Sequence, residues 1–247
     1  MTREHDRIRD EFTRAAPTFS DRTAGRFSSL GVVAFSGARA GDTVVEVGSG
    51  TGEFLSEFAR HAGLVVGVDL TPAMLVEARS RHPRVIGVNG DGARLPLRTR
   101  SVDLVASAQA LHHIAQPFPV VREMRRVLKR DGRMLIVDQI ATEKAEEALA
   151  MNELDLLRDP SHAACRPASA LRILLGAAGL VVEKEKVVES VGRFSDWMPP
   201  QEFPSDRVAR VRALIAERGG ETGMDFRRDG DDWLFTRRRV MLLARRA

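Results

Sequence analysis

Three glycines separated by single residues follow an apolar run in VVEVGSGTGEF, residues 44–54. Gly48, Gly50 and Gly52 allow the backbone to take positive φ and to approach a ligand closely. The apolar run predicts a buried strand, and a helix should start just after the turn. The segment therefore predicts a nucleotide-binding turn, a feature that several classes of cofactor-dependent enzyme share.

Two carboxylates help to choose among those classes. Glu46 lies just before the turn, where it would repel a pyrophosphate but would suit a ligand with an ammonium group. The spacing G-x-G-x-G also differs from the G-x-G-x-x-G expected for a pyrophosphate on a helix N-terminus. Asp69 ends the next apolar run and could accept hydrogen bonds from both ribose hydroxyls. The residues therefore favour S-adenosylmethionine (SAM) over NAD.

The elements that must position these residues alternate along the chain. From residue 42, the β-rich runs TVVEV, LVVGVD, RVIGVN, VDLVAS and RMLIVD are separated by stretches with helical spacing. This alternation predicts a parallel sheet wrapped by helices. The final run, WLFTRRRVMLLARR, predicts a last strand that pairs back antiparallel, because no helix of crossover length precedes it.

Four motifs, in the same order, resemble those of a known family: the class I SAM-dependent methyltransferases, and more closely the group that includes the ubiquinone and menaquinone biosynthesis methyltransferases. The matching pieces are VVEVGSGTGEF, VVGVDLTPAMLVEAR, VNGDGARLPLRTRSVDLVASAQALHHI and REMRRVLKRDGRMLIVD, within residues 12–138. The resemblance implies an α/β fold, Rossmann-like, with a seven-stranded, mostly parallel sheet, helices on both faces, an antiparallel last strand and helical cap insertions.

The resemblance also implies roles for individual residues. Gly48, Gly50 and Gly52 would pass beside the methionine part of SAM, with Glu46 oriented toward its amino group. Asp69 would hold the ribose, and Asp91 would accept a hydrogen bond from the adenine amino group. The alternative for each is that it only caps the following helix. The remaining cofactor neighbours are expected to be Leu70, Met74, Gly92, Ala93 and Gln109.

The exit of the fourth predicted strand, SAQALHHI, is where this fold brings side chains to the reactive methyl group. His112 or His113 could act as a general base, since a histidine can take up a proton near neutral pH. The alternative is that the pair packs or caps. Adjacent histidines on a helix point about 100° apart, so we expect one to face the pocket and we expect no metal site. Asp138 could hold a substrate hydroxyl or a cation, or cap a helix.

A small-molecule acceptor is expected. SAQALHHI lacks the Asn or Asp, Pro, Pro, aromatic motif that holds a flipped base, and Cys165 lies outside the position of a C5-methylating cysteine, which argues against nucleic acid. A quinone-like or other aromatic acceptor is among the candidates, and O-, N- and C-methylation stay open. So do two other functions, a nicotinamide-dependent oxidoreductase and a noncatalytic SAM-binding protein.

The segments outside the alternation predict a cover for the sheet. We expect one domain over 1–247, with an N-terminal helical lid (1–40), a SAM-binding core (41–140), substrate-cap excursions (141–170 and 194–224) and a C-terminal strand (225–247). Helices are predicted over 2–16 and 21–38, and Phe12 and Phe19 could close over the cofactor. The pocket walls are expected to include Leu156, Arg158, His162, Trp197, Met198 and Phe203.

Composition sets the remaining expectations. The 247 residues are 43% hydrophobic and 29% charged, which is typical of a soluble globular protein. No apolar run is long enough for a membrane span and the N-terminus is charged, so a cytoplasmic location is expected. Cys165 is interpreted as structural. The RRR run at 237–239 is interpreted as a solvated strand edge, with phosphate binding as the alternative; the oligomeric state stays open.

Overall fold

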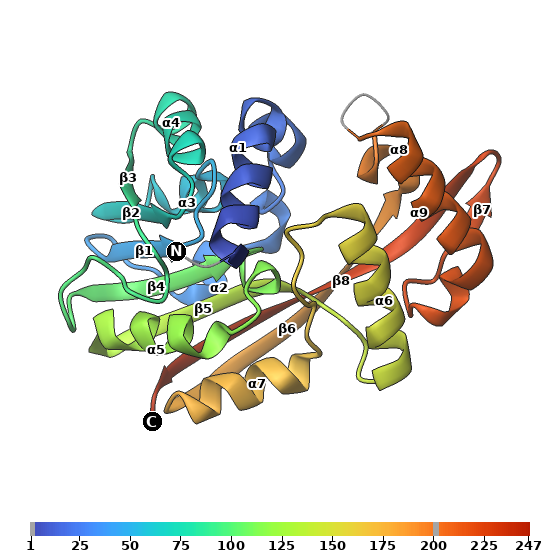
Figure 1. The fold of residues 1–247 in the computed structure, drawn as a ribbon. Helices are drawn as coiled ribbons and strands as arrows, with labels where there is room; N and C mark the ends of the chain where they lie inside the picture. Colours follow the sequence, from blue (N-terminus) through green and yellow to red (C-terminus); the bar gives the residue numbers. More distant parts are fainter. Residues whose placement is uncertain (1–2, 200–202) are drawn as a thin grey trace.

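A mixed sheet runs through the centre of the molecule (Figure 1). The computed structural model describes residues 3–199 and 203–247. In this part of the chain the sheet has eight strands in the order β3-β2-β1-β4-β5-β8-β6, with β7 paired to β8. The strands are β1 (Thr43–Val47), β2 (Leu64–Asp69), β3 (Val85–Asn89), β4 (Val102–Ala108), β5 (Leu128–Ile140), β6 (Leu180–Arg193), β7 (Arg227–Asp229) and β8 (Asp232–Arg246).

The first five strands are parallel and the last ones are not. β8 pairs antiparallel with β5 on one side and with β6 on the other. The predicted α/β fold and the antiparallel last strand are confirmed. The interpretation of the RRR run as a strand edge is wrong, because β8 pairs with β6 along residues 237–239 and also with β5 at Arg238 and Arg239.

Helices lie on both faces of the sheet. They are α1 (Arg3–Thr23), α2 (Val32–Ser36), α3 (Glu53–Phe58), α4 (Pro72–Arg81), α5 (Pro117–Val127), α6 (Ala145–Arg158), α7 (Ala168–Ala177), α8 (Phe194–Trp197) and α9 (Ser205–Arg218), with 3₁₀ turns η1 (Ser28–Leu30), η2 (Leu111–His113) and η3 (Gly219–Glu221). In this described part of the chain, no helix is both long and apolar enough to cross a membrane.

The first two helices differ from their predicted bounds. α1 continues through Pro17 to Thr23, and a 3₁₀ turn and the short α2 replace the long second helix. The breaks come at Gly25, Gly31 and Gly37, which all have positive φ and so cannot continue a right-handed helix. Residue 2, the predicted start of the first helix, lies outside the described residues.

Two apolar cores cover the two faces of the sheet, because neighbouring residues of a strand point to opposite sides. Val105 packs in the core beneath α5 and α7, together with Met124 of α5. The adjacent Leu104 packs in the other core, with Phe54 and Phe58 of α3. The sheet is therefore buried on both sides at β1, β2 and β4, whereas the edge strand β3 is largely exposed.

A third core lies under the helices at one end of the sheet, where α6, α8, α9 and β7 gather (Figure 1). It contains Leu154 of α6, Phe194 of α8, Val211 of α9 and Phe235 of β8. These helices come from the two predicted excursions. Residues 200–202 of the second excursion lie outside the described residues.

Candidate active site

The first cavity, of about 420 Å³, opens at the carboxyl ends of β1, β2 and β4. Parallel strands bring the residues that follow them to one edge of the sheet. Ten of the predicted cofactor residues line this cavity: Glu46, Gly48, Gly50, Asp69, Leu70, Met74, Asp91, Gly92, Ala93 and Gln109. Gly52 does not line it, and lies instead at the N-cap of α3 with φ +83°.

Glycine is required in this turn for a steric reason as well as for ligand binding. Gly48 has φ +75°, and a Cβ there would lie 2.5 Å from Cβ of Ala110. Ala110 belongs to the loop after β4, so the absence of a side chain at Gly48 lets the β1 and β4 loops meet. Gly50, with φ +51°, has only an edge atom of Phe19 within 4 Å of such a Cβ. The turn is thus closed toward β4 and open toward the cavity.

Glu46 is 1% exposed and lines the cavity, and its Oε2 atom has no hydrogen-bond partner. Burial, and then the neighbouring charge of Asp69, raises the pKa of Glu46 well above its usual range. A buried carboxyl of this kind is stabilised as the anion by a cation placed beside it. The cavity floor therefore suits a ligand with a positively charged group.

Both predicted nucleoside carboxylates also make local bonds. Asp69 accepts from the backbone N–H groups of Gly50 at 2.7 Å and Thr71 at 2.8 Å, and Asp91 accepts from that of Ala93 at 2.8 Å. Burial raises the pKa of Asp69, although these backbone bonds oppose the shift. Since an ionised carboxylate has about four acceptor positions, each can still accept from a ligand in the cavity.

A larger cavity, of about 1120 Å³, adjoins the first. Phe12 and Phe19 of α1, Arg26, Gln109 and His113 line both cavities. Gln109 has φ +54°, and its buried Nε2 atom has no hydrogen-bond partner. The strained residue after β4 therefore stands at the boundary between two adjoining spaces.

His112 lines the larger cavity from η2, and its hydrogen bonds fix its tautomer. Nδ1 lies 2.5 Å from Oδ1 of Asp138, and the backbone N–H of His112 donates to Oδ2 of the same carboxylate at 3.1 Å. The Gln139 amide nitrogen lies 3.2 Å from Nε2. Because an amide nitrogen can only donate, Nε2 accepts and Nδ1 carries the proton. Nε2 of His112 is therefore unprotonated, and its lone pair accepts from Gln139.

His113 has a different environment. Its Nδ1 lies 3.0 Å from Oγ of Ser161, and its ring packs edge-on against Phe12 with centroids 5.0 Å apart. Burial, and then the neighbouring His112, lowers the pKa of His113 to about 3. His113 therefore stays neutral at physiological pH and forms a wall shared by both cavities.

The family model described as "Methyltransferase domain" matches residues 45–136. The chain is 31% identical over 179 residues, 70% of each chain, to the uncharacterized methyltransferase YcgJ of Bacillus subtilis (strain 168). The crystal structure of YcgJ superposes with a TM-score of 0.81 at 25% identity, covering 89% of this chain and 99% of that one.

The chain belongs to the SAM-dependent methyltransferases.

The comparisons confirm the predicted family, enzyme class and cofactor, and they set aside the nicotinamide-dependent alternative. The resemblance to the quinone-biosynthesis group is also confirmed. The methyltransferase is 31% identical over 102 residues to the demethylmenaquinone methyltransferase of Beutenbergia cavernae, 41% of this chain and 42% of that protein. The acceptor is not fixed by these relationships.

The first cavity fits SAM on its own geometry. Besides Glu46 Oε2, the buried atoms Ser49 Oγ, Thr51 Oγ1 and Gln109 Nε2 lack hydrogen-bond partners, and all four residues line the cavity. Buried polar groups are normally paired. A ligand with an ammonium group and several hydroxyls would supply partners to such atoms.

The predicted pocket walls divide into two sets. Arg158, Trp197 and Phe203 line the larger cavity of the methyltransferase. Met198 and His162 do not; both are buried, and His162 Nε2 lies 2.8 Å from Oδ1 of Asn152. Leu156 is 49% exposed and also lies away from the cavity.

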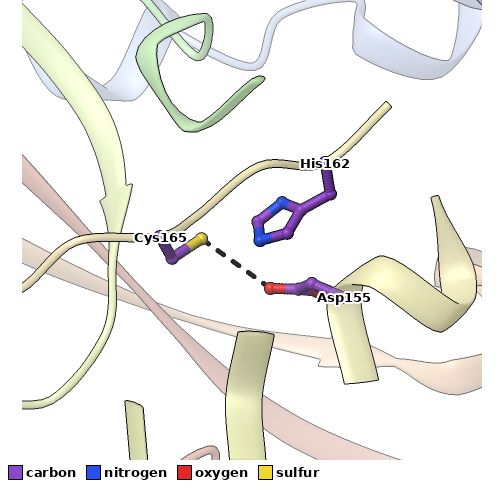
Figure 2. A group of neighbouring side chains, drawn as sticks. All are labelled: Asp155, His162 and Cys165. Carbon is purple, nitrogen blue, oxygen red and sulfur yellow. Dashed lines mark hydrogen bonds between the residues drawn. The ribbon is translucent and has the colours of Figure 1, made fainter. Parts of the chain in front are cut away.

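Asp155, His162 and Cys165 form a buried group (Figure 2). Their potential ligand atoms lie within 4.8 Å of one another, and the Cys165 thiol donates to Oδ2 of Asp155 at 3.7 Å. However, Arg237 donates to both oxygens of Asp155, and burial raises the pKa of Cys165 well above its usual range. A guanidinium beside the carboxylate and a protonated thiol both disfavour a metal ion.

Gln139, Arg26 and Arg239 all line the larger cavity. From the sequence, no role was expected for Gln139 or Arg26, and Arg239 was considered only within the RRR run, as an alternative phosphate site. Gln139 directly follows Asp138, so its position near a strand end was a usable signal. Arg237 and Arg239 are two residues apart on β8 and therefore share a face of the sheet, whereas Arg238 points away and pairs with Glu189. Because side chains alternate in direction along a strand, the sequence could have indicated that Arg237 and Arg239 share one face.

Proposed function

We propose that this methyltransferase transfers the methyl group of SAM to a small molecule held in the larger cavity, and that His112 accepts a proton from the methylated atom. The observation that carries the proposal is the Asp138–His112 pair, which keeps the proton on Nδ1 and leaves Nε2 unprotonated in a residue that lines the larger cavity. A general base must offer a lone pair to the substrate proton, so the substrate would have to replace the Gln139 amide at Nε2. An acceptor with an acidic O–H, N–H or activated C–H meets this requirement.

The proposed cofactor contacts follow the residues of the first cavity. Glu46 would bind the ammonium group, Asp69 the ribose hydroxyls and Asp91 the adenine amino group, beside Gly92 and Ala93. When bound, SAM supplies an activated methyl group on a sulfonium. The protein then has to align donor and acceptor and to exclude water.

The domain organisation supports this division of labour. We propose one domain over 1–247 in which α1 is the lid, because Phe12 and Phe19 line both cavities. The helices of the segments 141–170 and 194–224 carry Arg158 and Trp197 to the larger cavity. The absence of a base-holding motif after β4 supports a metabolite over nucleic acid, and the predicted cytoplasmic location stays a prediction.

The proposal is tested by incubating the enzyme with methyl-labelled SAM and a metabolite extract, followed by mass spectrometry. We expect a labelled small molecule, at least about tenfold less of it per unit time with His112→Gln, and unchanged affinity of that variant for S-adenosylhomocysteine. Labelling of RNA or protein in place of a metabolite would refute the acceptor class. Full activity of His112→Gln would refute the base.

A further inference from the structure

The larger cavity is rich in positive charge. Among the described residues that line it, seven are arginines and three carry carboxylates. A cavity used only for a neutral aromatic acceptor would need no such excess, because buried charge without a partner is costly. Whether this positive charge can bind a ligand depends on which of the arginines have partners within the chain.

Three of these arginines are neutralised by partners within the chain. Arg237 forms a buried, two-pronged pair with Asp155. Arg14 pairs with Glu11, and Arg193 pairs with Asp229. The pKa of Arg237 is raised, since the Asp155 carboxylate outweighs the effect of burial. These three guanidinium groups are not available to bind a further anion strongly.

Arg239 is different. Within the described residues its side chain makes no ion pair or hydrogen bond, and its buried Nε atom has no partner. Burial, and then the adjacent Arg237, lowers the pKa of Arg239. Nearby, burial and the charges of Arg239, Arg158 and Arg22 lower the pKa of Arg26 to about 10. Mutual repulsion of this kind is relieved by a bound anion.

The carboxylates of the cavity do not neutralise Arg239. Glu11 is paired with Arg14. Asp159 accepts from the backbone N–H of Ser161 at 2.9 Å and from its hydroxyl at 2.6 Å. The third, Asp196, is exposed on α8 and makes no ion pair with Arg239.

The position of Arg239 relates it to the proposed chemistry. In the antiparallel pairing of β5 with β8, Arg239 lies directly opposite Gln139. Directly opposed side chains of such a pair have Cβ atoms about 5 Å apart. Gln139 in turn donates to Nε2 of His112 at 3.2 Å. A group bound at Arg239 would thus lie close to the proposed base, in the cavity walled by Trp197 and Phe203.

We propose that Arg239 binds an anionic group, a carboxylate or a phosphate, of the methyl acceptor, and that the acceptor of this enzyme is therefore a small anion. Guanidinium groups bind both anions through paired, charge-assisted hydrogen bonds. Arg26, which forms no ion pair within the described residues, adds to the attraction from the boundary with the cofactor cavity. The inference rests on the proposed function, because it takes the larger cavity as the acceptor site.

The experiment divides a metabolite extract at pH 7 on an anion exchanger into retained and unretained fractions. Each is incubated with the full-length enzyme and methyl-labelled SAM, and the retained fraction is also tested after treatment with alkaline phosphatase. We expect label only in the retained fraction. Loss of label after phosphatase treatment assigns the anion as a phosphate, and survival assigns it as a carboxylate. Label only in the unretained fraction would overturn the inference while leaving the proposed function standing; no label in either fraction would overturn both.

Matched variants make the assignment specific to Arg239. Arg239→Gln should lower kcat/KM for the retained acceptor by about 10- to 100-fold, mainly through KM, with unchanged affinity for S-adenosylhomocysteine. Arg210→Gln removes an equal charge from an exposed position of α9 and should leave both quantities unchanged. Equal kcat/KM of Arg239→Gln and wild type would contradict the role of Arg239.

Discussion

The role that we propose for Glu46 would come at the expense of stability. Its carboxyl is buried, its Oε2 atom lacks a partner, and its pKa is raised by burial and by Asp69. A carboxyl whose pKa is raised in the folded state binds more protons folded than unfolded, so its contribution to stability is lost as the pH rises through the folded-state pKa. At neutral pH, Glu46 therefore opposes folding until a cation lies beside it.

Replacing Glu46 by glutamine tests this balance. Glu46→Gln should raise the melting temperature of the ligand-free enzyme, because a neutral amide costs less to bury than a carboxylate. It should also weaken SAM binding by about 10- to 100-fold, the usual value of a hydrogen bond between charged groups. Calorimetry measures both quantities. Glu53→Gln is the control, because Glu53 also lines this cavity but its Oε1 atom lies 3.2 Å from Nε2 of His82. Wild-type SAM affinity in Glu46→Gln would remove Glu46 from the ammonium site.

His113 gives a second prediction. Its pKa is lowered from the usual 6.5 to about 3, chiefly by burial, so the unfolded state takes up a proton before the folded state does. The free energy of unfolding should therefore fall as the pH is lowered from about 6.5, by up to about 1.4 kcal/mol per pH unit from this residue. Urea unfolding at pH 7, 6 and 5 should show a smaller loss for His113→Gln than for wild type. Equal slopes would mean that His113 is accessible to protons.

Individual residues differed in how far the sequence could place them. Glycine and carboxylate positions that follow strands are set by chain order, and ten of the eleven predicted cofactor residues do surround one cavity. The proposed base could not be assigned from sequence, because its assignment depends on Asp138 and Gln139 of β5 meeting His112 of η2. Their roles in binding and catalysis are still predictions.

Among the elements, β8 was predicted to be an antiparallel strand, but its place inside the sheet was not predicted. The alternation of WLFTRRRVMLLARR indicates a strand, yet only the pairing with β6 shows that it is interior. β6 follows α7 along the chain and pairs antiparallel with β8 on the side away from β5, so β8 lies between β5 and β6. No local sequence pattern encodes this strand order. Two of the arginines that looked solvated, Arg237 and Arg239, line a cavity.

The Asp155–Arg237 pair links α6 to β8 and should hold the cap on the sheet. Both side chains are buried, and Arg237 keeps the pKa of Asp155 below its usual value despite burial. Asp155→Asn should lower the free energy of unfolding by about 3–5 kcal/mol, since it leaves a buried guanidinium unpaired. Glu153→Gln, which removes an exposed pair with Arg218 from the same helix, should cost at most about 1 kcal/mol. Chemical denaturation compares the two, and similar costs would contradict a special role for the buried pair.

At the scale of the whole molecule, two cavities meet at the carboxyl edge of the sheet. α1 covers both, and the cap helices close the far wall of the larger one. The sequence could predict that these segments cover the sheet, but not where α1 ends, because Pro17 is tolerated within it and Gly25 stops it. We therefore expect methyl transfer to take place across the boundary at Gln109.

The most direct test of this account is a crystal structure of the enzyme with S-adenosylhomocysteine. We predict the amino group of the ligand beside Glu46, its ribose on Asp69, and its sulfur at the boundary that Gln109 and His113 share between the two cavities. A ligand bound elsewhere, or one whose sulfur faces away from the larger cavity, would contradict the account.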